Sequence, residues 1–317
     1  MVVLKRPAVP GWGVPHVQPD EEDDDDGPFQ EDNYGFEISH SVSFNGILCL
    51  ESEFYGERRV VLWNPTTNEF KLLPLPENNP SWYILADHYQ IGYDHVKDDY
   101  KMIRYTRYSP KINPYKHVPS EHFWEMYSLS SNSWKKINVN MPPSYWTRQQ
   151  VYLDGVSHRW DKTETNTYLV PFDFCKESFI TTPIPSYVYD SLDFPLVRRR
   201  LMVLNGSIAF MVHDTEASTF HISILGELGV KESWTKLFIV GPLPCLDHLI
   251  GARKKGNTLF RKKDSQLAWF DLSTRMIDEI GVTTERFYCK ILFHKESLLP
   301  IGGIYTNFPS CFHPQDI

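Results

Sequence analysis

The chain reads Ser43-Phe44-Asn45-Gly46-Ile47-Leu48-Cys49-Leu50, which places an Asn-Gly pair between two apolar segments. Asn and Gly supply the positive φ angles of a tight hairpin turn, so the stretch predicts two antiparallel strands. Turn-like glycines recur at separations of 46, 63, 51 and 50 residues, at Gly46, Gly92, Gly155, Gly206 and Gly256. A period in this range is typical of β-propellers, in which each repeat is one small sheet.

Each predicted turn is followed by further strand signals. Apolar and often aromatic strands are expected at residues 60–63, 126–129, 168–172, 221–224 and 268–272. A fourth strand follows, and twice it has the form Ser-Trp-x-Lys-Ile/Leu, so Trp134 and Trp234 are expected to be buried at equivalent places. Proline pairs come after four of these strands, and proline lacks the N–H that a central strand needs. The prolines therefore mark crossovers between repeats.

The composition agrees with an all-β fold. Aromatic residues make up 14% of the 317 residues and there are 23 prolines, which favour strands and interrupt helices. Helical periodicity is not sustained over any long stretch. We therefore predict a single β-propeller over residues 41–312 with about six blades, although five to seven blades fit the loose spacing.

Charge is unevenly distributed along the chain. Residues 1–40 hold ten acidic against two basic residues, which accounts for the whole net charge of −8, and the rest of the chain is neutral. We predict a disordered acidic leader at residues 1–40 and a short tail at residues 313–317. A neutral body gives no electrostatic reason to bind nucleic acid or a membrane.

The cysteines and the N-terminus indicate an intracellular, reduced protein, cytoplasmic or nuclear. The five cysteines are odd in number and widely spaced, which fits neither a disulfide framework nor a CxxC zinc motif. No signal peptide or membrane-spanning run is recognisable. No nucleotide, metal or catalytic motif is complete, so we expect neither a cofactor nor a metal, and we expect that the protein is not an enzyme.

Two groups of residues are candidates for binding a protein partner. Aromatic residues on crossovers of a rigid scaffold are typical recognition anchors, and here they are Trp82, Tyr83, Tyr145, Trp146, Tyr187 and Tyr189. The second group is basic and consists of Arg253, Lys254 and Lys255, with Arg261, Lys262 and Lys263 close behind in the sequence. Alternatively, the aromatic residues fill gaps between repeats and the basic residues are simply solvated.

Several of these motifs together resemble a known family. Residues 43–50, followed by Leu62-Trp63-Asn64-Pro65-Thr66-Thr67-Asn68-Glu69-Phe70-Lys71-Leu72-Leu73-Pro74, look like the opening of the F-box-associated domain of plant F-box proteins, including F-box/kelch-repeat and S-locus F-box proteins. Gly92-Tyr93-Asp94, residues 127–135 and Leu153-Asp154-Gly155 also match. The resemblance covers about residues 41–310 and implies a kelch-like propeller that selects a protein substrate for an SCF E3 ubiquitin ligase.

In that family a separate leucine-rich, helical F-box docks on a Skp-type adaptor. Here Leu4 is the only leucine before Leu48, and five prolines interrupt residues 1–40, so no F-box is predicted there and adaptor binding is not expected. Three functions stay open. They are an interaction domain that binds a protein substrate, a free-standing propeller scaffold unrelated to ubiquitin, and a propeller enzyme.

Overall fold

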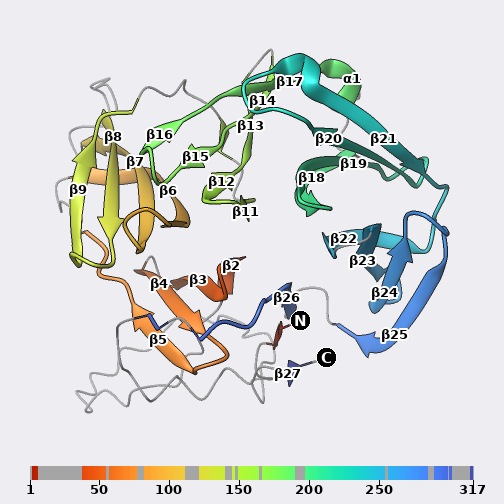
Figure 1. Cartoon of the computed structure of the whole chain (residues 1–317), viewed down its shortest axis with the longest axis horizontal. Helices are drawn as coiled ribbons and strands as arrows, with labels where there is room; N and C mark the ends of the chain where they lie inside the picture. The colour runs from red at the N-terminus through yellow and green to blue at the C-terminus, as the bar shows by residue number, and fades with distance from the viewer. Residues whose placement is uncertain are drawn as a thin grey trace, which may run out of the picture.

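The computed structural model describes residues 2–5, 38–54, 57–76, 82–110, 121–139, 145–146, 149–163, 166–189, 197–253, 256–284, 289–298, 300–301 and 315–316. In these residues the chain is nearly all β-strand, with one short α-helix, α1 (Ser186–Tyr189), and one 3-10 turn, η1 (Lys231–Ser233). The strands form antiparallel sheets arranged in a ring (Figure 1). The predicted all-β propeller is confirmed.

Four blades are four-stranded sheets in which neighbouring strands follow chain order. Blade 1 consists of β2 (Ile38–Phe44), β3 (Ile47–Phe54), β4 (Glu57–Asn64) and β5 (Glu69–Leu72). Blade 2 consists of β6 (Trp82–Asp94), β7 (Asp99–Pro110), β8 (Glu121–Ser128) and β9 (Ser133–Ile137). Blade 4 consists of β18 (Val197–Leu204), β19 (Ser207–Asp214), β20 (Thr219–Leu225) and β21 (Trp234–Val240). Blade 5 consists of β22 (Leu246–Ala252), β23 (Asn257–Lys262), β24 (Gln266–Asp271) and β25 (Ile277–Thr283).

Blade 3 is one meander whose strands are interrupted. It consists of β10 (Tyr145–Trp146), β11 (Val151–Leu153), β12 (Val156–His158), β13 (Trp160–Lys162), β14 (Thr167–Leu169), β15 (Phe172–Asp173), β16 (Ser178–Phe179) and β17 (Thr182–Ile184). The register of Ser157 with Phe172 continues unchanged to Trp160 with Leu169, so β12 and β13 form a single strand opposite β14 and β15. The two halves therefore count as one blade.

The sixth blade joins segments from both ends of the described chain. In it β1 (Val2–Lys5) lies between β26 (Cys289–Leu292) and β27 (Gln315–Asp316). The first of these segments belongs to the predicted leader and the last to the predicted tail, and the structure pairs both within one sheet. Residues 6–37, where the acidic run lies, are outside the described residues. The ring thus has six blades in the described part of the chain.

The ring is closed by contacts between blade 1 and the segment that follows β26. Asn64 Nδ2 donates a hydrogen bond to the Ser297 carbonyl at 2.9 Å. The backbone N–H of Ile301 donates to Glu69 Oε2 at 3.1 Å. Closure of this kind covers the apolar sheet faces that the first and last blades of an open array would expose.

A recurring turn explains how the sequence ends its strands. An Asn or Asp closes the strand, and its Oδ1 accepts backbone N–H groups two and three residues later, at Asn64, Asp94, Asp173, Asp214 and Asp271. Four residues after each of these, a non-glycine residue has a positive φ, namely Asn68, Asp98, Glu177, Ser218 and Arg275. The side chain thus stabilises a tight turn that contains a left-handed residue.

The predicted turn glycines divide into two kinds. Asn45-Gly46, Asp154-Gly155 and Asn205-Gly206 have positive φ at both residues and are hairpin turns, as predicted. Gly92 is different, because it lies inside β6 and a Cβ there would meet the Phe174 ring at 2.4 Å. Gly92 therefore allows blades 2 and 3 to pack closely and does not form a turn.

The apolar core lies between adjacent blades. Trp234 is only 3% exposed and packs with residues of blades 3 and 4, which confirms its predicted burial. Trp134 is only partly buried, so it is less buried than predicted. Its Nε1 donates to the Pro74 carbonyl at 2.6 Å. Both tryptophans begin the outermost strand of a blade and contact the segment that leaves the preceding blade.

Two consecutive glutamines join the inner strands of three blades. Gln150 exchanges two hydrogen bonds with the backbone of Ile91 in β6, at 2.6 and 3.3 Å. Gln149 exchanges two with the backbone of Leu201 in β18, both at 3.0 Å. These pairings satisfy backbone groups that no neighbouring strand supplies within the blade.

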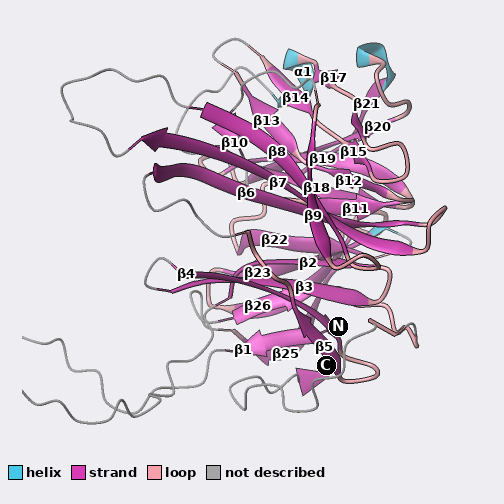
Figure 2. Cartoon of the chain, turned by 90° about the vertical axis from the view of Figure 1, so that its left-hand side faces the viewer, coloured by secondary structure: helices cyan, strands magenta, loops and turns pink. Residues whose placement is uncertain are grey.

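The two ends of each blade carry different connections. The turns that join its first to second and its third to fourth strands lie at one end, which we name the turn face. The connections between second and third strands, and the crossovers to the next blade, lie at the opposite end, which we name the crossover face. Figure 2 shows the blades from the side, with the long strands β6 and β7 reaching furthest from the ring.

Candidate protein-binding face

The six predicted aromatic residues lie in secondary structure, not in loops. Trp82 and Tyr83 begin β6, and Tyr145 and Trp146 form β10, where they pair with Lys162 and Asp161. Tyr187 and Tyr189 belong to α1, at the rim of the ring between blades 3 and 4 (Figure 1). The six residues thus belong to three different elements.

Of these six side chains only that of Tyr187 lies within the described residues. It is 49% exposed, and its hydroxyl donates to the Trp234 carbonyl at 3.0 Å. Tyr187 thus bridges two blades while leaving half of its surface exposed. The remaining five stay predictions.

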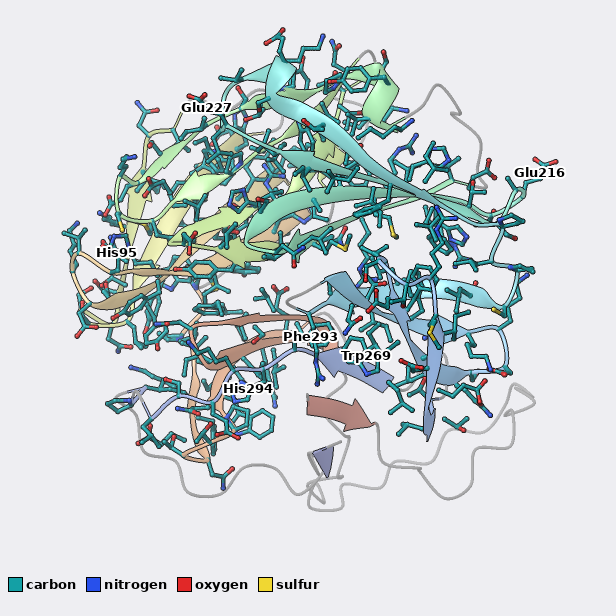
Figure 3. The ribbon with its side chains drawn as sticks, turned by 45° about the vertical axis from the view of Figure 1, so that its right-hand side comes forward. His95, Glu216, Glu227, Trp269, Phe293 and His294 are labelled. Carbon is teal, nitrogen blue, oxygen red and sulfur yellow. The ribbon has the colours of Figure 1, made fainter. Side chains whose placement is uncertain are left out.

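The predicted basic group is divided between the two faces. Arg253 follows β22 on the turn face, whereas Arg261 and Lys262 lie near the far end of β23. The Arg253 guanidinium lies 4.5 Å from the centre of the Trp269 ring, and Trp269 lies beside Phe293 (Figure 3). Lys254 and Lys255 are outside the described residues. The length of β23 thus separates Arg261 and Lys262 from Arg253, while Arg253, Lys254 and Lys255 stay a predicted binding group.

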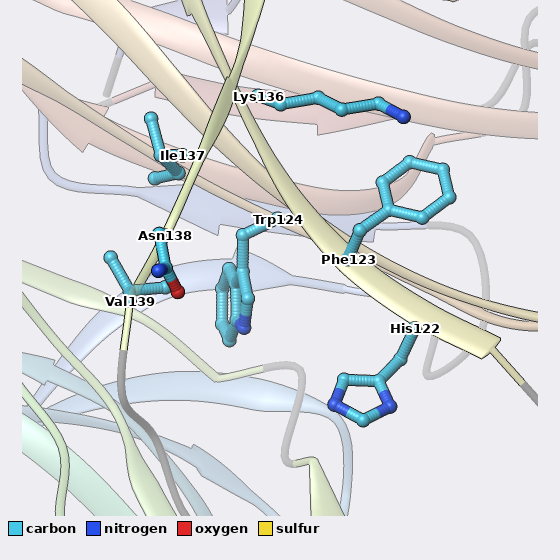
Figure 4. Close-up of a pocket in the computed structure, with 7 residues that line it drawn as sticks. All are labelled: His122, Phe123, Trp124, Lys136, Ile137, Asn138 and Val139. Atoms are coloured by element: carbon cyan, nitrogen blue, oxygen red, sulfur yellow. The ribbon is translucent and has the colours of Figure 1, made fainter.

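A pocket of about 380 Å³ lies on the outer edge of blade 2, at the crossover end (Figure 4). It is lined by His122, Phe123, Trp124, Lys136, Ile137, Asn138 and Val139. The Lys136 ammonium lies 4.8 Å from the centre of the Phe123 ring. The pocket combines an aromatic wall with cationic and titratable side chains at its rim.

The pocket lies where the outermost strand stops. The last registered pair of β8 and β9 is Trp124 with Ile137, while β8 begins three residues earlier, at Glu121. The indole of Trp124 is 7% exposed and packs against Phe179 of blade 3 at a ring distance of 4.9 Å. A rigid, interlocked aromatic side chain therefore supports the pocket.

The turn face holds a compact ion network between blades 2 and 3. Lys101 Nζ lies 2.6 Å from Asp94 Oδ2 and 2.8 Å from Glu177 Oε1. Lys97 and Lys135 also reach Glu177. Burial alone would raise the pKa of Asp94, but hydrogen bonds from Lys101 and from backbone amides hold it at about 2. Positive and negative charges thus neutralise one another here.

A cysteine and a histidine meet beside this network without forming an activated pair. Cys175 Sγ lies 3.2 Å from His95 Nδ1. Burial and a hydrogen bond to Asp94 raise the pKa of the Cys175 thiol. The residue is thus a neutral thiol near pH 7, unlike the thiolate that a nucleophilic cysteine requires.

A second group of charges lies on the crossover face, between blades 4 and 5. Arg198 Nη1 lies 3.0 Å from Asp247 Oδ1, and Arg261 Nη2 lies 4.0 Å from Asp247 Oδ2. Arg200 contacts His248, which is next to Asp247 on β22. Sequence analysis missed Arg198 and Arg200, although Arg198-Arg199-Arg200 is the densest run of arginine in the chain.

The described residues contain neither a candidate metal site nor a candidate membrane-spanning helix. There, three or more His, Cys, Asp or Glu side chains do not gather in a way that could hold a metal ion. In the same residues, helices long and apolar enough to cross a bilayer are absent.

The ring of six blades and its turns define a β-propeller protein. Its sequence matches the F-box associated beta propeller domain over residues 18–311, and the chain belongs to that family. F-box-associated domains are protein-interaction modules. The pocket and the second group of charges make the crossover face the candidate protein-binding face of this one.

Three F-box proteins of Arabidopsis thaliana illustrate the relationship. The putative F-box protein At3g17490 is 26% identical over 71% of this chain and 55% of its own length. F-box protein CPR1 is 25% identical over 76% of this chain and 62% of its own length. F-box protein At4g22390 is 25% identical over 84% of this chain and 70% of its own length. The chain thus spans little more than half the length of the first of these relatives.

Solved structures share the fold only distantly. The Dos1 propeller matches with a TM-score of 0.39 and 11% identity, over 79% of this chain and 61% of that chain. YjhT matches with a TM-score of 0.45 and 10% identity, over 80% of this chain and 86% of that chain. Similarity at this level carries no information on function.

Proposed function

We propose that this propeller binds a substrate protein through its crossover face, as the substrate-recognition part of an SCF-type ubiquitin ligase does. Membership in the F-box-associated family and the F-box proteins among its relatives support the proposal. The proposal is one of protein binding alone, without a catalytic step, a cofactor, a nucleic acid or a membrane. The location that we propose is the cytoplasm or the nucleus.

The observation that carries the proposal is the blade 2 pocket. Partner proteins bind best where an aromatic anchor is held rigidly beside an opening, and Trp124 is held in this way by Phe179. The end of β9 opposite Trp124 leaves the first residues of β8 beside the pocket, so an extended partner segment can add along this strand. Lys136 at the rim favours a segment with acidic residues.

Affinity purification with matched lysine variants tests the proposal. Lys136→Glu reverses a charge at the pocket, and Lys176→Glu reverses an exposed charge on the turn face, where Lys176 is 73% exposed. The tagged chain, purified from Arabidopsis extract treated with a proteasome inhibitor, should retain a specific protein in the wild type and in Lys176→Glu but lose it in Lys136→Glu. Decreased ubiquitination of that protein when the chain is overproduced would identify it as a ligase substrate, because a chain that binds the substrate without the adaptor competes with a full-length receptor. Equal retention by both variants would contradict the proposal.

The 317-residue polypeptide itself is proposed not to bind the Skp-type adaptor. The leucine-poor, proline-interrupted residues 1–40 are the support for this proposal. A pull-down of the purified chain against the purified adaptor checks it. Submicromolar binding would show that another surface of the chain takes the place of an F-box.

A further inference from the structure

The crossover face carries a cluster of arginines between the inner strands of blades 4 and 5. We name it the arginine cluster and define it as Arg198, Arg200 and Arg261 with Asp247 and His248. Successive side chains of a strand lie on opposite faces, so Arg198 and Arg200 share one face of β18 and Leu201 lies on the other. The two arginines contact β22 of the next blade, at Asp247 and His248. Arg261 lies opposite His248 in the register of β22 and β23. Both inner strands begin here, beside the centre of the ring (Figure 1).

The cluster holds more positive than negative charge. Asp247 is the carboxylate that Arg198 and Arg261 share, at 3.0 and 4.0 Å. Arg200 instead contacts the ring nitrogen Nε2 of His248. Burial, together with Arg200, Arg261 and Arg198, lowers the pKa of His248 to about 3, so the ring is neutral and accepts the hydrogen bond. Among these five side chains, three guanidiniums therefore face one carboxylate.

Neighbouring groups report the same positive potential. Burial and the charge of Arg261 lower the pKa of Arg200 to about 10. Burial and Arg198 lower the pKa of His213 to about 4; Lys263 acts in the same direction, whereas Asp247 and Asp214 oppose it. Positive charge that is partly removed from water is costly unless an anion neutralises it.

Arg198 has donors to spare for such an anion. Its hydrogen bonds to the Asp247 side chain and to the Asp247 carbonyl, at 3.0 and 3.2 Å, both start from Nη1. A guanidinium carries five N–H donors in a planar fork, so Nε and Nη2 are directed elsewhere. The Arg198 side chain is 45% exposed, which makes this part of the fork accessible from solvent.

We propose that the arginine cluster binds a phosphorylated side chain of the partner protein. A phosphoryl group carries nearly two negative charges and three acceptor oxygens, which match the remaining donors of the Arg198 fork beside the Arg200 guanidinium. A carboxylate carries one charge and two acceptor oxygens and is the weaker match. The inference rests on the proposed function, because it gives the chemistry of one contact on the same crossover face.

Small probes test this site without knowledge of the partner. N-acetyl-O-phosphoserine amide, N-acetyl-glutamate amide and N-acetyl-serine amide offer a phosphoryl group, a carboxylate and a neutral hydroxyl at constant ionic strength. The readout is the side-chain Nε–Hε NMR signals of the arginines. The phosphoserine probe should shift the signals of Arg198 and Arg200 saturably, with a Kd of about 1 mM, and should bind at least about fivefold more tightly than the glutamate probe.

Variants then locate the binding. Arg198→Gln with Arg200→Gln should weaken phosphoserine binding by about tenfold or more, while Arg253→Gln on the turn face should leave it unchanged. Non-saturating shifts that affect Arg253 as much as Arg198 would overturn the proposal, as would equal affinity for phosphoserine and glutamate. Because the probes need no partner, they report on the cluster even if Lys136→Glu shows that partner capture uses another face. Failure of the probes alone would leave the proposed function standing.

Discussion

The turn face and the crossover face treat charge in opposite ways. On the turn face, Lys101 is almost fully buried and is neutralised by Asp94 and Glu177 from two blades. On the crossover face, Arg198 and Arg261 share the Asp247 carboxylate, whereas Arg200 contacts the neutral ring of His248. The difference indicates that the Lys101 network serves to hold blades 2 and 3 together, whereas part of the half-exposed Arg198 fork is available to a partner.

The largest expected loss of stability follows truncation of the tryptophan that begins an outermost strand and joins two blades. Trp234→Ala should lower the free energy of unfolding by about 3–5 kcal/mol, because the side chain is 3% exposed and packs between blades 3 and 4. Trp134→Ala, at the equivalent place but only partly buried, should cost about half as much. Urea unfolding followed by circular dichroism measures both. Equal losses would mean that the two repeats bury their tryptophans alike.

A smaller loss is expected from the neutralised network of the turn face. Asp94→Ala should lower the free energy of unfolding by about 3 kcal/mol, because Lys101 would lose its closest buried partner and two backbone N–H groups would lose their acceptor. Asp247→Ala on the crossover face is the matched control. If chemical denaturation showed the larger loss for Asp247→Ala, the two faces would have the reverse roles.

The same network predicts how stability changes in acid. Hydrogen bonds from Lys101 and Lys135 outweigh burial and hold the pKa of Glu177 at about 2. Hydrogen bonds from Lys101 and from backbone N–H groups do the same for Asp94. Carboxylates with lowered pKa stabilise the fold above their unfolded pKa near 4, and this stability is lost as the pH falls toward 2. Asp94 alone should contribute about 2 kcal/mol over that interval. Denaturation between pH 5 and pH 2 should therefore be less pH-dependent in Asp94→Asn, and an unchanged profile would contradict the assignment.

The smallest loss of stability is expected for a variant on the crossover face. Arg200→Gln removes a positive charge from a cluster that has an excess, so its free energy of unfolding should stay within about 1 kcal/mol of the wild type. Thermal and urea unfolding measure this change. A loss as large as that of Asp94→Ala would show that Arg200 is a structural residue.

Much of the fold could be predicted because its signals are local. Asn45-Gly46, Asp154-Gly155 and Asn205-Gly206 form the expected hairpin turns. Strand β9 spans Ser133–Ile137, which are the residues of the predicted Ser-Trp-x-Lys-Ile strand. Gly92 was misassigned because a close approach to Phe174, 82 residues away, leaves no mark on the residues around it.

A clearer repeat signal was present and was overlooked. An aromatic or histidine residue followed by Asn or Asp ends a strand at Trp63-Asn64, Tyr93-Asp94, Phe172-Asp173, His213-Asp214 and Phe270-Asp271. The role of β1 could not be read in the same way, because strand pairing between Val3 and Ile291 depends on how the whole ring closes.

The candidate site was less predictable than the fold. Clusters in the sequence are not clusters in space, since β23 carries Arg261 away from Arg253. Conversely, the pairing of β8 with β9 brings His122 and Val139 to one pocket, and the packing of blades 4 and 5 joins residues of β18 to β22 and β23. Only the run Arg198-Arg199-Arg200 could have directed attention to blade 4.

Hydrogen–deuterium exchange of the chain with and without its captured partner tests most directly that the crossover face is the binding face. The account predicts slower exchange on binding in residues 121–124 and 137–139 around the pocket and in residues 197–200 and 246–248 of the arginine cluster. It predicts unchanged exchange in the turn-face segments 95–98, 129–132 and 174–177. Protection confined to the turn-face segments would contradict it.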